Sequence, residues 1–308
     1  MESQTPITTS PATVSIQAVV RENVQCLIEA GIETARLDAE ILVSHVLKLT
    51  KEQFVLFSDM PVRPEQMRHC EELLLRRIRR EPVAHITGRQ EFWSLDFRVT
   101  PDVLIPRPET ERLVEITLGL AREFPENKAL KILDVGTGSG AIAVSLAREL
   151  PWSMIWATDV SIEALKVARS NAARYGASER VRLLHGDLFE PIGEIAGRFD
   201  LIVSNPPYIR SAEIDALEPE VSLWEPRGAL DGGVDGLDFY RRIAREAGDH
   251  LAPNGAVAVE IGADMGEEVA RLFAGGGCYT GVSAFQDYAG RDRVVMAKLA
   301  GKKAKSIF

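Results

Sequence analysis

The sequence predicts an α/β chain with a small N-terminal helical domain and a doubly wound sheet domain, joined by a β-hairpin linker. Three observations predict it. Helical periodicity runs over about residues 14–81, aromatic and β-branched residues alternate with polar ones over 83–105, and strand and helix patterns alternate from Leu130 onward. The last pattern is typical of a mostly parallel sheet with helices on both faces. We therefore expect domains at 1–81 and 109–308, with the linker at 82–108.

The N-terminal domain is expected to be helical because its apolar residues recur with a period near 3.6. Three segments show this pattern, at 15–31, 35–49 and 63–82. The first ends in Gly31, and Pro64 stands near the start of the third, where each residue type is favoured. No strand pattern interrupts these segments.

The linker reads "VAHITGRQEFWSLDFRVTPDVLI" (83–105), and its alternation predicts a hairpin. We expect Trp93 and Phe97 to belong to the hairpin core rather than to a substrate platform. A helix is expected to follow over 109–121.

The sheet domain is expected to contain five strands that alternate with helices, followed by two closing strands joined by a turn. Short apolar or β-branched runs mark the strands, at 131–136, 153–161, 181–188, 199–204, the second half of 244–262, and two within 280–299. Helical patterns occupy 141–151, 162–176, the first half of 244–262, and 265–273. The closing pair requires one antiparallel strand.

Composition excludes several classes of protein. The three cysteines are far apart and form no CxxC pair, so neither a disulfide framework nor a zinc site is indicated, and we expect no metal. The formal net charge is −9, whereas non-specific binding to nucleic acid depends on Lys and Arg neutralising phosphates. DNA is therefore not an expected partner.

The ends and the apolar runs of the chain bear on location. No apolar run approaches the roughly 20 residues of a membrane span. The start, "MESQTPITTSPATVS", lacks the basic and apolar regions of a secretory signal, so a short disordered tail is expected. The prediction is a cytoplasmic monomer without membrane contact.

A glycine-rich turn, "DVGTGSG" (134–140), follows the first strand of the sheet and opens a helix. Its glycines allow tight turning and close approach to a ligand. The spacing is neither the G-x-G-x-x-G of dinucleotide folds nor a P-loop. The candidate binding residues of this turn are Gly136, Thr137, Gly138, Ser139 and Gly140.

Acidic residues end the next two strands. Asp159 stands about 20 residues beyond the glycines, where a carboxylate can accept hydrogen bonds from ribose hydroxyls. Asp187 ends the third strand, where an adenine amine can be met, and Leu188 can pack against the base. The three strand ends together predict a nucleoside site.

This series resembles the class I S-adenosylmethionine-dependent methyltransferases. The resemblance implies a Rossmann-like sheet of seven strands with an antiparallel final pairing, and S-adenosylmethionine as the cofactor, leaving S-adenosylhomocysteine as product. The glycines alone would not distinguish this cofactor from a dinucleotide.

A rigid polar corner, Asn205-Pro206-Pro207-Tyr208, ends the fourth strand and is expected to face the methyl group. It suits methylation of a planar nitrogen, whose lone pair is delocalised and whose two N–H groups need acceptors. The side-chain oxygen of Asn205 and the backbone carbonyl of Pro206 are two such acceptors. The prolines hold the loop in shape, and Tyr208 can stack on the planar group. We predict catalytic roles for Asn205, Pro206 and Tyr208, with Asn205 also touching the cofactor.

Two long segments resemble the PrmC/HemK family of protein-glutamine methyltransferases, which modify peptide-chain release factors. They are "EFWSLDFRVTPDVLIPRPETERLVE" (91–115) and "LEPEVSLWEPRGALDGGVDGLDFYRRI" (217–243). The resemblance implies transfer of a methyl group to the side-chain nitrogen (N5) of the glutamine in the Gly-Gly-Gln motif of class 1 release factors, in support of translation termination. It also implies that residues 205–208 hold the glutamine amide and that the N-terminal domain helps to recognise the substrate. Leu188 departs mildly from relatives with an aromatic residue there.

Two other readings stay open on the residues alone. A nucleic-acid methyltransferase acting on a base amine can share the corner, but residues 1–81 carry ten Lys/Arg against twelve Asp/Glu, a poor surface for a duplex. A non-catalytic binding module that kept the fold is the other alternative, and the intact motifs argue against it.

The roles of two groups of charged residues are left open. Arg107 and Glu109 could shape the entrance or serve structure alone. The run Arg76, Arg77, Arg79 and Arg80 could be a solvated helix face or a docking surface for an acidic partner.

Overall fold

The computed structural model describes residues 14–126, 128–193 and 198–301. The chain divides into two compact units, Met1–Thr87 and Gly88–Phe308. The tail expected at the N-terminus lies mostly outside the described residues. No helix in the described part of the chain is long and apolar enough to cross a membrane.

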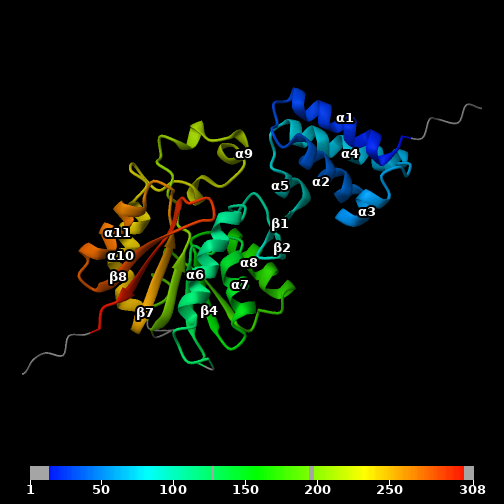
Figure 1. Cartoon of the computed structure of the whole chain (residues 1–308). Coiled ribbons are helices and arrows are strands. Elements are labelled where there is room, and N and C mark those ends of the chain that lie inside the picture. The colour runs from blue at the N-terminus through cyan, green and yellow to red at the C-terminus, as the bar shows by residue number, and fades with distance from the viewer. Residues whose placement is uncertain (1–13, 127, 194–197, 302–308) are drawn as a thin grey trace, which may run out of the picture. The chain divides into compact units, whose positions relative to one another are not determined.

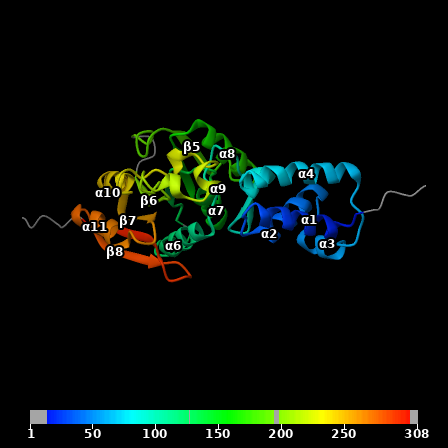
Figure 2. The ribbon, with the colours of Figure 1, turned by 90° about the horizontal axis from the view of Figure 1, so that it is seen from above.

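The first unit is helical, as predicted. Its helices in the described residues are α1 (Ile16–Glu29), α2 (Ala35–Leu47), α3 (Lys51–Leu56), α4 (Pro64–Ile78) and α5 (Val83–Thr87). The Ser15 side chain caps α1 by accepting a hydrogen bond from the amide of Ala18. Helices α1, α2 and α4 pack side by side around a shared apolar core that includes Leu27, Ala39 and Val43 (Figures 1 and 2).

The arginine run at the end of α4 is largely engaged within this unit. Arg77 is buried and donates from Nε to Oδ2 of buried Asp38 on α2, at 2.7 Å. Arg76 pairs with Glu81, and Arg80 donates to the carbonyl of Gly31 at 2.9 Å. These contacts favour a structural role for three of the four arginines.

Breaking the buried pair in this unit is expected to destabilise it. Asp38→Ala leaves the Arg77 guanidinium buried without its carboxylate, which typically costs about 3–5 kcal/mol. The measurement is amide hydrogen exchange of α2 and α4 as denaturant is raised. Glu40→Ala is the matched control, because Glu40 makes an exposed pair with Arg36 on the same helix, worth about 0.3–0.5 kcal/mol. Equal effects of the two changes would refute a stabilising role for the buried pair.

The linker differs from its predicted bounds at its start. Residues 83–87, expected in the hairpin, form α5 and belong to the first unit. The hairpin itself consists of β1 (Arg89–Phe92) and β2 (Leu95–Arg98), paired antiparallel. Trp93 and Ser94 form its two-residue turn with φ of 52° and 57°, as a type I′ turn requires. Phe97 is fully buried against Phe92, as expected of the hairpin core.

The second unit contains one seven-stranded sheet. Its strands are β3 (Lys131–Val135), β4 (Met154–Asp159), β5 (Val181–His185), β6 (Phe199–Ser204), β7 (Leu251–Glu260), β8 (Tyr279–Gln286) and β9 (Asp292–Leu299). They lie in the order β5-β4-β3-β6-β7-β9-β8. The pairs from β5 to β7 are parallel, whereas β9 runs antiparallel to both β7 and β8. The predicted doubly wound sheet with an antiparallel final pairing is confirmed.

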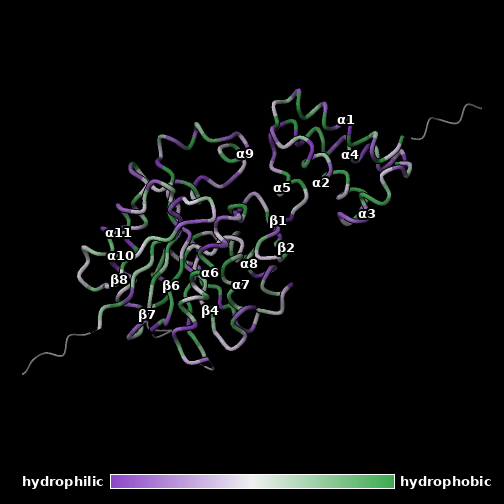
Figure 3. The backbone as a smooth tube through the Cα atoms, viewed as in Figure 1, coloured by the Kyte–Doolittle hydropathy of each residue, from purple (hydrophilic) through white to green (hydrophobic). Residues whose placement is uncertain are grey.

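Helices cover both faces of this sheet (Figure 1). They are α6 (Glu111–Ala121), α7 (Ala141–Glu149), α8 (Ile162–Arg174), α10 (Asp238–His250) and α11 (Gly266–Gly275). One core lies between the sheet and α6, α7 and α8, and the other lies between the sheet and α10 and α11. The central strands β6 and β7 are accordingly among the most apolar stretches of the chain, as Figure 3 shows.

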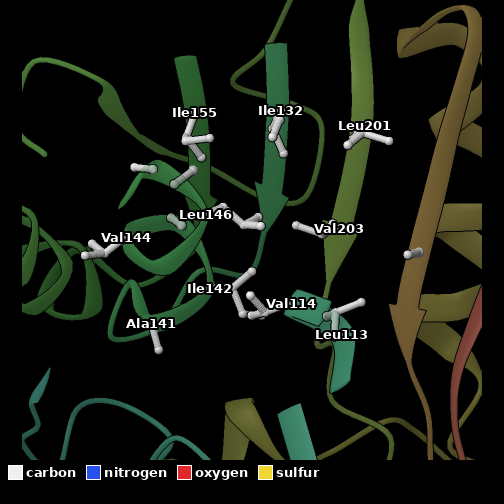
Figure 4. Packing of buried hydrophobic residues seen from close by; sticks show 14 of the residues in the cluster. Leu113, Val114, Ile132, Ala141, Ile142, Val144, Leu146, Ile155, Leu201 and Val203 are labelled. Carbon is white, nitrogen blue, oxygen red and sulfur yellow. The ribbon is translucent and has the colours of Figure 1, made fainter. Parts of the chain in front are cut away.

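The first of these cores fixes α7, and with it the turn that precedes α7. Ile142 and Leu146 of α7 point toward Ile132 of β3 and Val203 of β6 (Figure 4). All four side chains are at most 5% exposed. Burying one such side chain contributes about 1.5–3 kcal/mol, so this packing holds the start of α7 against the ends of β3 and β6.

A lobe with little regular structure connects β6 to α10. It contains the 3₁₀ turn η2 (Ile214–Ala216), the short helix α9 (Pro219–Ser222) and the 3₁₀ turn η3 (Arg227–Ala229). A further 3₁₀ turn, η1 (Pro108–Thr110), leads from the linker into α6. Both segments lie at the carboxyl end of the sheet, where the site forms.

Candidate functional site

A cavity of about 240 Å³ opens at the carboxyl ends of β3, β4, β5 and β6. The four strand ends supply residues 136–139, 159–161, 186–188 and 204–207 to its walls. The linker adds Leu104, Pro106 and Arg107, and the α9 lobe adds Pro226 and Ala229. Parallel strands that end at one edge of a sheet bring these distant segments together, as the sequence predicted.

The glycine-rich turn forms one wall of the cavity. Gly136, Thr137, Gly138 and Ser139 line it, whereas Gly140 does not. Gly140 instead turns the chain into α7 with φ of +79°, and a Cβ there would lie 3.1 Å from the Cβ of Ala168. The position therefore requires glycine for conformation and for close packing against α8.

Asp159 ends β4 on the cavity wall and braces the glycine turn. Its carboxylate accepts hydrogen bonds from the amides of Gly138, at 2.8 Å, and Ser161, at 2.9 Å. Burial raises the pKa of Asp159, and the two amide hydrogen bonds oppose that shift. A carboxylate has about four lone-pair sites, so Asp159 can still accept a hydrogen bond from a ligand hydroxyl.

The end of β5 contributes Asp187 and Leu188, both on the cavity wall. Asp187 accepts a hydrogen bond from Arg242 of α10 at 2.7 Å, which fixes its carboxylate. Leu188 has φ of 47° and is buried, so its side chain is held in place for apolar contact. Phe239 of α10 also lines the cavity and adds an aromatic side chain that the sequence did not indicate.

Asp134, at the start of the glycine turn, is a buried carboxylate that sequence reasoning did not single out. Its Oδ2 accepts a hydrogen bond from the Thr137 hydroxyl at 2.6 Å, while Oδ1 has no hydrogen-bond partner among the described residues. Burial raises its pKa to about 7. The acid at the head of a glycine-rich turn is the sequence signal that marks it.

The rigid corner after β6 forms the wall opposite the glycine turn. Asn205, Pro206 and Pro207 line the cavity. Tyr208 does not, because its ring is half-buried against the core beneath α10. Burial raises the pKa of Tyr208 to about 12, so its hydroxyl remains neutral.

Two buried residues adjoin the Asn205 side chain, and one of them, Thr110, also lines the cavity. Its side-chain nitrogen donates to the hydroxyl of Thr110, in η1, at 3.2 Å. The side chains of Thr110 and Asn205 are close enough to the carboxylate of Glu260, at the end of β7, for both to lower its pKa by hydrogen bonding. Burial raises the pKa of Glu260 to about 7. An acid that ends the apolar run "VAVE" next to β6 is the signal that could have found it.

An ion pair ties the linker wall to the α9 lobe. Arg107 pairs with Glu225, whose Oε2 also accepts a hydrogen bond from the amide of Ile105 at 3.1 Å. Burial raises the pKa of Glu225, and Arg107 opposes that shift. Arg107 thus both lines the cavity and braces its two outer walls, while Glu109 does not line it.

Asn171 of α8 links the hairpin to the glycine turn. Its side-chain nitrogen donates to the carbonyls of Arg98 and Ser139, and its oxygen accepts from the amide of Arg98. The side chain is fully buried. No local pattern marks this residue, because its partners lie 32 and 73 positions away in the chain.

The cavity fits S-adenosylmethionine. The turn offers a backbone cradle, Asp159 can accept from the ribose, and Leu188 with Phe239 offers apolar contact to a base. The cofactor carries an ammonium and a sulfonium cation, and neither Asp134 nor Asp159 is paired with a lysine or arginine in the described residues. These two unpaired carboxylates therefore suit a cationic nucleoside.

Comparisons with known proteins agree with this geometry. The family description "PrmC N-terminal domain" matches residues 18–88, and "Methyltransferase small domain" matches 114–218. Release factor glutamine methyltransferases from Geobacter sulfurreducens and Cereibacter sphaeroides are 48% and 45% identical to this chain. The alignments cover 89% and 91% of this chain, and 93% and 97% of those relatives.

A crystal structure of a release-factor-specific protein-(glutamine-N5) methyltransferase from Alicyclobacillus acidocaldarius is also similar. It is 33% identical, and the match covers 66% of this chain and 99% of that one with a TM-score of 0.40.

Fold and site together define an S-adenosylmethionine-dependent methyltransferase. With relatives of this similarity over most of its length, the chain belongs to the release factor glutamine methyltransferase family.

Substituting Gly140 is expected to weaken cofactor binding. Gly140→Ala places a side chain in the left-handed region, which costs about 1–3 kcal/mol, and crowds Ala168. Because about 1.4 kcal/mol is tenfold in affinity, we expect the Kd for S-adenosylmethionine to rise about tenfold or more, as measured by calorimetric titration. Gly119→Ala on α6 is the control, since a Cβ there meets open space. An unchanged Kd in Gly140→Ala would show that the turn can adjust.

Proposed function

We propose that this protein transfers a methyl group from S-adenosylmethionine to the side-chain amide nitrogen of the glutamine in the Gly-Gly-Gln motif of class 1 release factors. The observation that carries the proposal is the position of Asn205 and Pro206 on the wall of the cofactor cavity. The relatives named release factor glutamine methyltransferase support the choice of acceptor.

The residues of the corner provide what an amide nucleophile needs. The cofactor supplies an electrophilic methyl group. The Asn205 side-chain oxygen and the Pro206 carbonyl accept the two N–H groups of the glutamine amide, which orients its nitrogen and draws positive charge toward it. Restricted backbone at Pro206 and Pro207 holds this geometry before the substrate arrives. One of the N–H protons leaves to solvent after the new N–C bond has formed.

The roles assigned to single residues follow the cavity wall. Gly136, Thr137, Gly138 and Ser139 would hold the cofactor, with Gly140 shaping the turn. Asp159, Asp187 and Leu188 would hold its nucleoside. Pro207 would contact the glutamine, and Tyr208, which lies behind the wall, would support the corner or reach the substrate only after a change of rotamer.

The proposal extends to partners and location. A release factor offers far more surface than one tripeptide, so the N-terminal unit is proposed to contribute to its recognition. Since release factors act at the ribosome, the enzyme is placed in the cytoplasm. It is proposed to act as a monomer, without DNA or membrane partners.

The test uses S-adenosylmethionine with an isotope-labelled methyl group. The protein is incubated with purified class 1 release factors, with versions in which the glutamine of Gly-Gly-Gln is alanine, and with DNA and RNA. Label on the unaltered factor alone is the expected result. Label on nucleic acid instead would reject glutamine as the acceptor.

A further inference from the structure

The amide of Asn205 must present its oxygen, and not its nitrogen, to the incoming glutamine. The two ends of an asparagine amide are nearly equal in size, so the cavity shape alone does not choose between them. If the side chain turned over, two N–H donors would face the N–H donors of the substrate. The choice has to come from the groups behind Asn205.

The fold brings two such groups to it from distant parts of the chain. Strands β6 and β7 pair in parallel with Ser204 opposite Val259, so Asn205 and Glu260 follow side by side at the two strand ends. Thr110 comes from η1, 95 positions before Asn205. Thr110 is 5% exposed and Glu260 is 1% exposed, so water does not compete for their hydrogen bonds.

The hydrogen bonds in this cluster have a direction. Once ionised, the Glu260 carboxylate only accepts, and its interaction with the Thr110 side chain then directs the single hydroxyl proton of Thr110 toward it. The Thr110 oxygen is then left to accept, and it accepts from the Asn205 nitrogen at 3.2 Å. With the amide reversed, the Asn205 oxygen would face acceptors alone.

Burial of the Glu260 carboxylate lowers the stability of the fold, so stability alone does not explain a glutamate at this position. Its Oε2 has no hydrogen-bond partner among the described residues. The buried cation Arg293 of β9 attracts the Glu260 carboxylate electrostatically, but it donates hydrogen bonds to the carbonyl of Ile261 and to Asp287. A buried carboxylate with a raised pKa, next to a residue that lines a cavity, is typical of functional sites.

Resting on the proposed function, we propose that Thr110 and Glu260 are positioning residues that lock the Asn205 amide with its oxygen toward the methyl acceptor. They act through Asn205: Glu260 sets the direction of the Thr110 hydroxyl, and Thr110 sets the direction of the amide. Loss of either side chain lets the Asn205 amide turn over. Its oxygen is then still present but no longer faces the glutamine.

A matched pair at Thr110 tests this directly. Thr110→Val keeps the shape and loses the hydroxyl, whereas Thr110→Ser keeps the hydroxyl. We expect kcat for release-factor methylation to fall about 10- to 100-fold in Thr110→Val, with little change in KM or in the Kd for S-adenosylmethionine, and to stay near the original value in Thr110→Ser. Glu260→Gln, whose amide can present either end, is expected to fall between them.

A readout without activity keeps the inference separate from the proposed function. The NMR signals of the Asn205 side-chain amide, identified by their loss in Asn205→Ala, are expected to shift in Thr110→Val and Glu260→Gln and to persist in Thr110→Ser. Shifted signals would support the positioning network even if no release factor were methylated. Unshifted signals in both variants, or equal kcat in Thr110→Val and Thr110→Ser, would overturn it.

Discussion

Asn205→Ala is expected to lower kcat for release-factor methylation by about 100- to 1,000-fold, the range found when one preorganised polar group is removed from a catalytic site. The loss follows from geometry: the side chain lines the cavity, and its nitrogen is held by a hydrogen bond to the Thr110 hydroxyl. Removing its oxygen leaves one substrate N–H without an acceptor and the nitrogen free to rotate away from the methyl group.

Single-turnover rates with saturating cofactor are the appropriate measurement. The Kd for S-adenosylmethionine is expected to change much less than kcat, because the glycine turn and Asp159 remain. Asn205→Asp keeps an acceptor oxygen but places a second carboxylate beside Glu260, so we expect an intermediate rate. A kcat for Asn205→Ala within tenfold of the original would exclude Asn205 from the reaction.

The parts of the site that lie next to strand ends could be predicted from the sequence. The glycine turn, Asp159 and the corner at 205–208 each follow a strand directly, and the topology of a doubly wound sheet brings such ends together. Recognising the order of strands was therefore enough to predict that these segments share one cavity.

The residues that the sequence did not reveal act through long-range contacts. Thr110 meets Asn205 across 95 positions, and Glu225 meets Ile105 across 120. Their partners are defined only when the chain is folded, and a single threonine or glutamate carries no local signal of that kind. A motif can also mislead in the opposite way. Tyr208 belongs to the corner motif, but its ring packs against the core and does not line the cavity.

Short elements were the weaker part of the fold prediction. Helices α3 and α5 contain six and five residues, too few to establish a period of 3.6. The β-branched residues of "VAHIT" (83–87) favoured a strand, and tertiary packing against the other helices of the first unit decided otherwise. Most long amphipathic helices and buried strands, by contrast, matched their predicted segments closely, although α10 begins at Asp238 and not at residue 244 as predicted.

Asp134→Asn is expected to stabilise the protein, and the gain is expected to grow with pH. Burial raises the pKa of Asp134 from 3.8 to about 7. The folded state therefore binds this proton more tightly than the unfolded state, and the free energy of unfolding falls as pH rises from about 4 to about 7. The uncharged amide escapes that loss, which amounts to about 2–4 kcal/mol above pH 7.

Urea denaturation at several pH values measures this effect. The advantage of Asp134→Asn should be smallest near pH 4 and level off above pH 7. The original protein and the variant should both keep some pH dependence, because burial also raises the pKa of Glu260 to about 7. A stability difference that does not vary with pH would mean that ionisation of Asp134 does not lower the free energy of unfolding.

A carboxylate that weakens the fold at neutral pH needs a compensating use. We expect that use to be attraction of the cationic cofactor from just behind the cavity wall, since Asp134 is buried and does not itself line the cavity. Asp134 adjoins the glycine turn, and its Oδ1 has no partner among the described residues. The same Asp134→Asn variant is therefore expected to bind S-adenosylmethionine more weakly at pH 8 while unfolding at higher urea. Tighter folding with unchanged cofactor affinity would contradict this reasoning, because the negative charge would then serve neither stability nor binding.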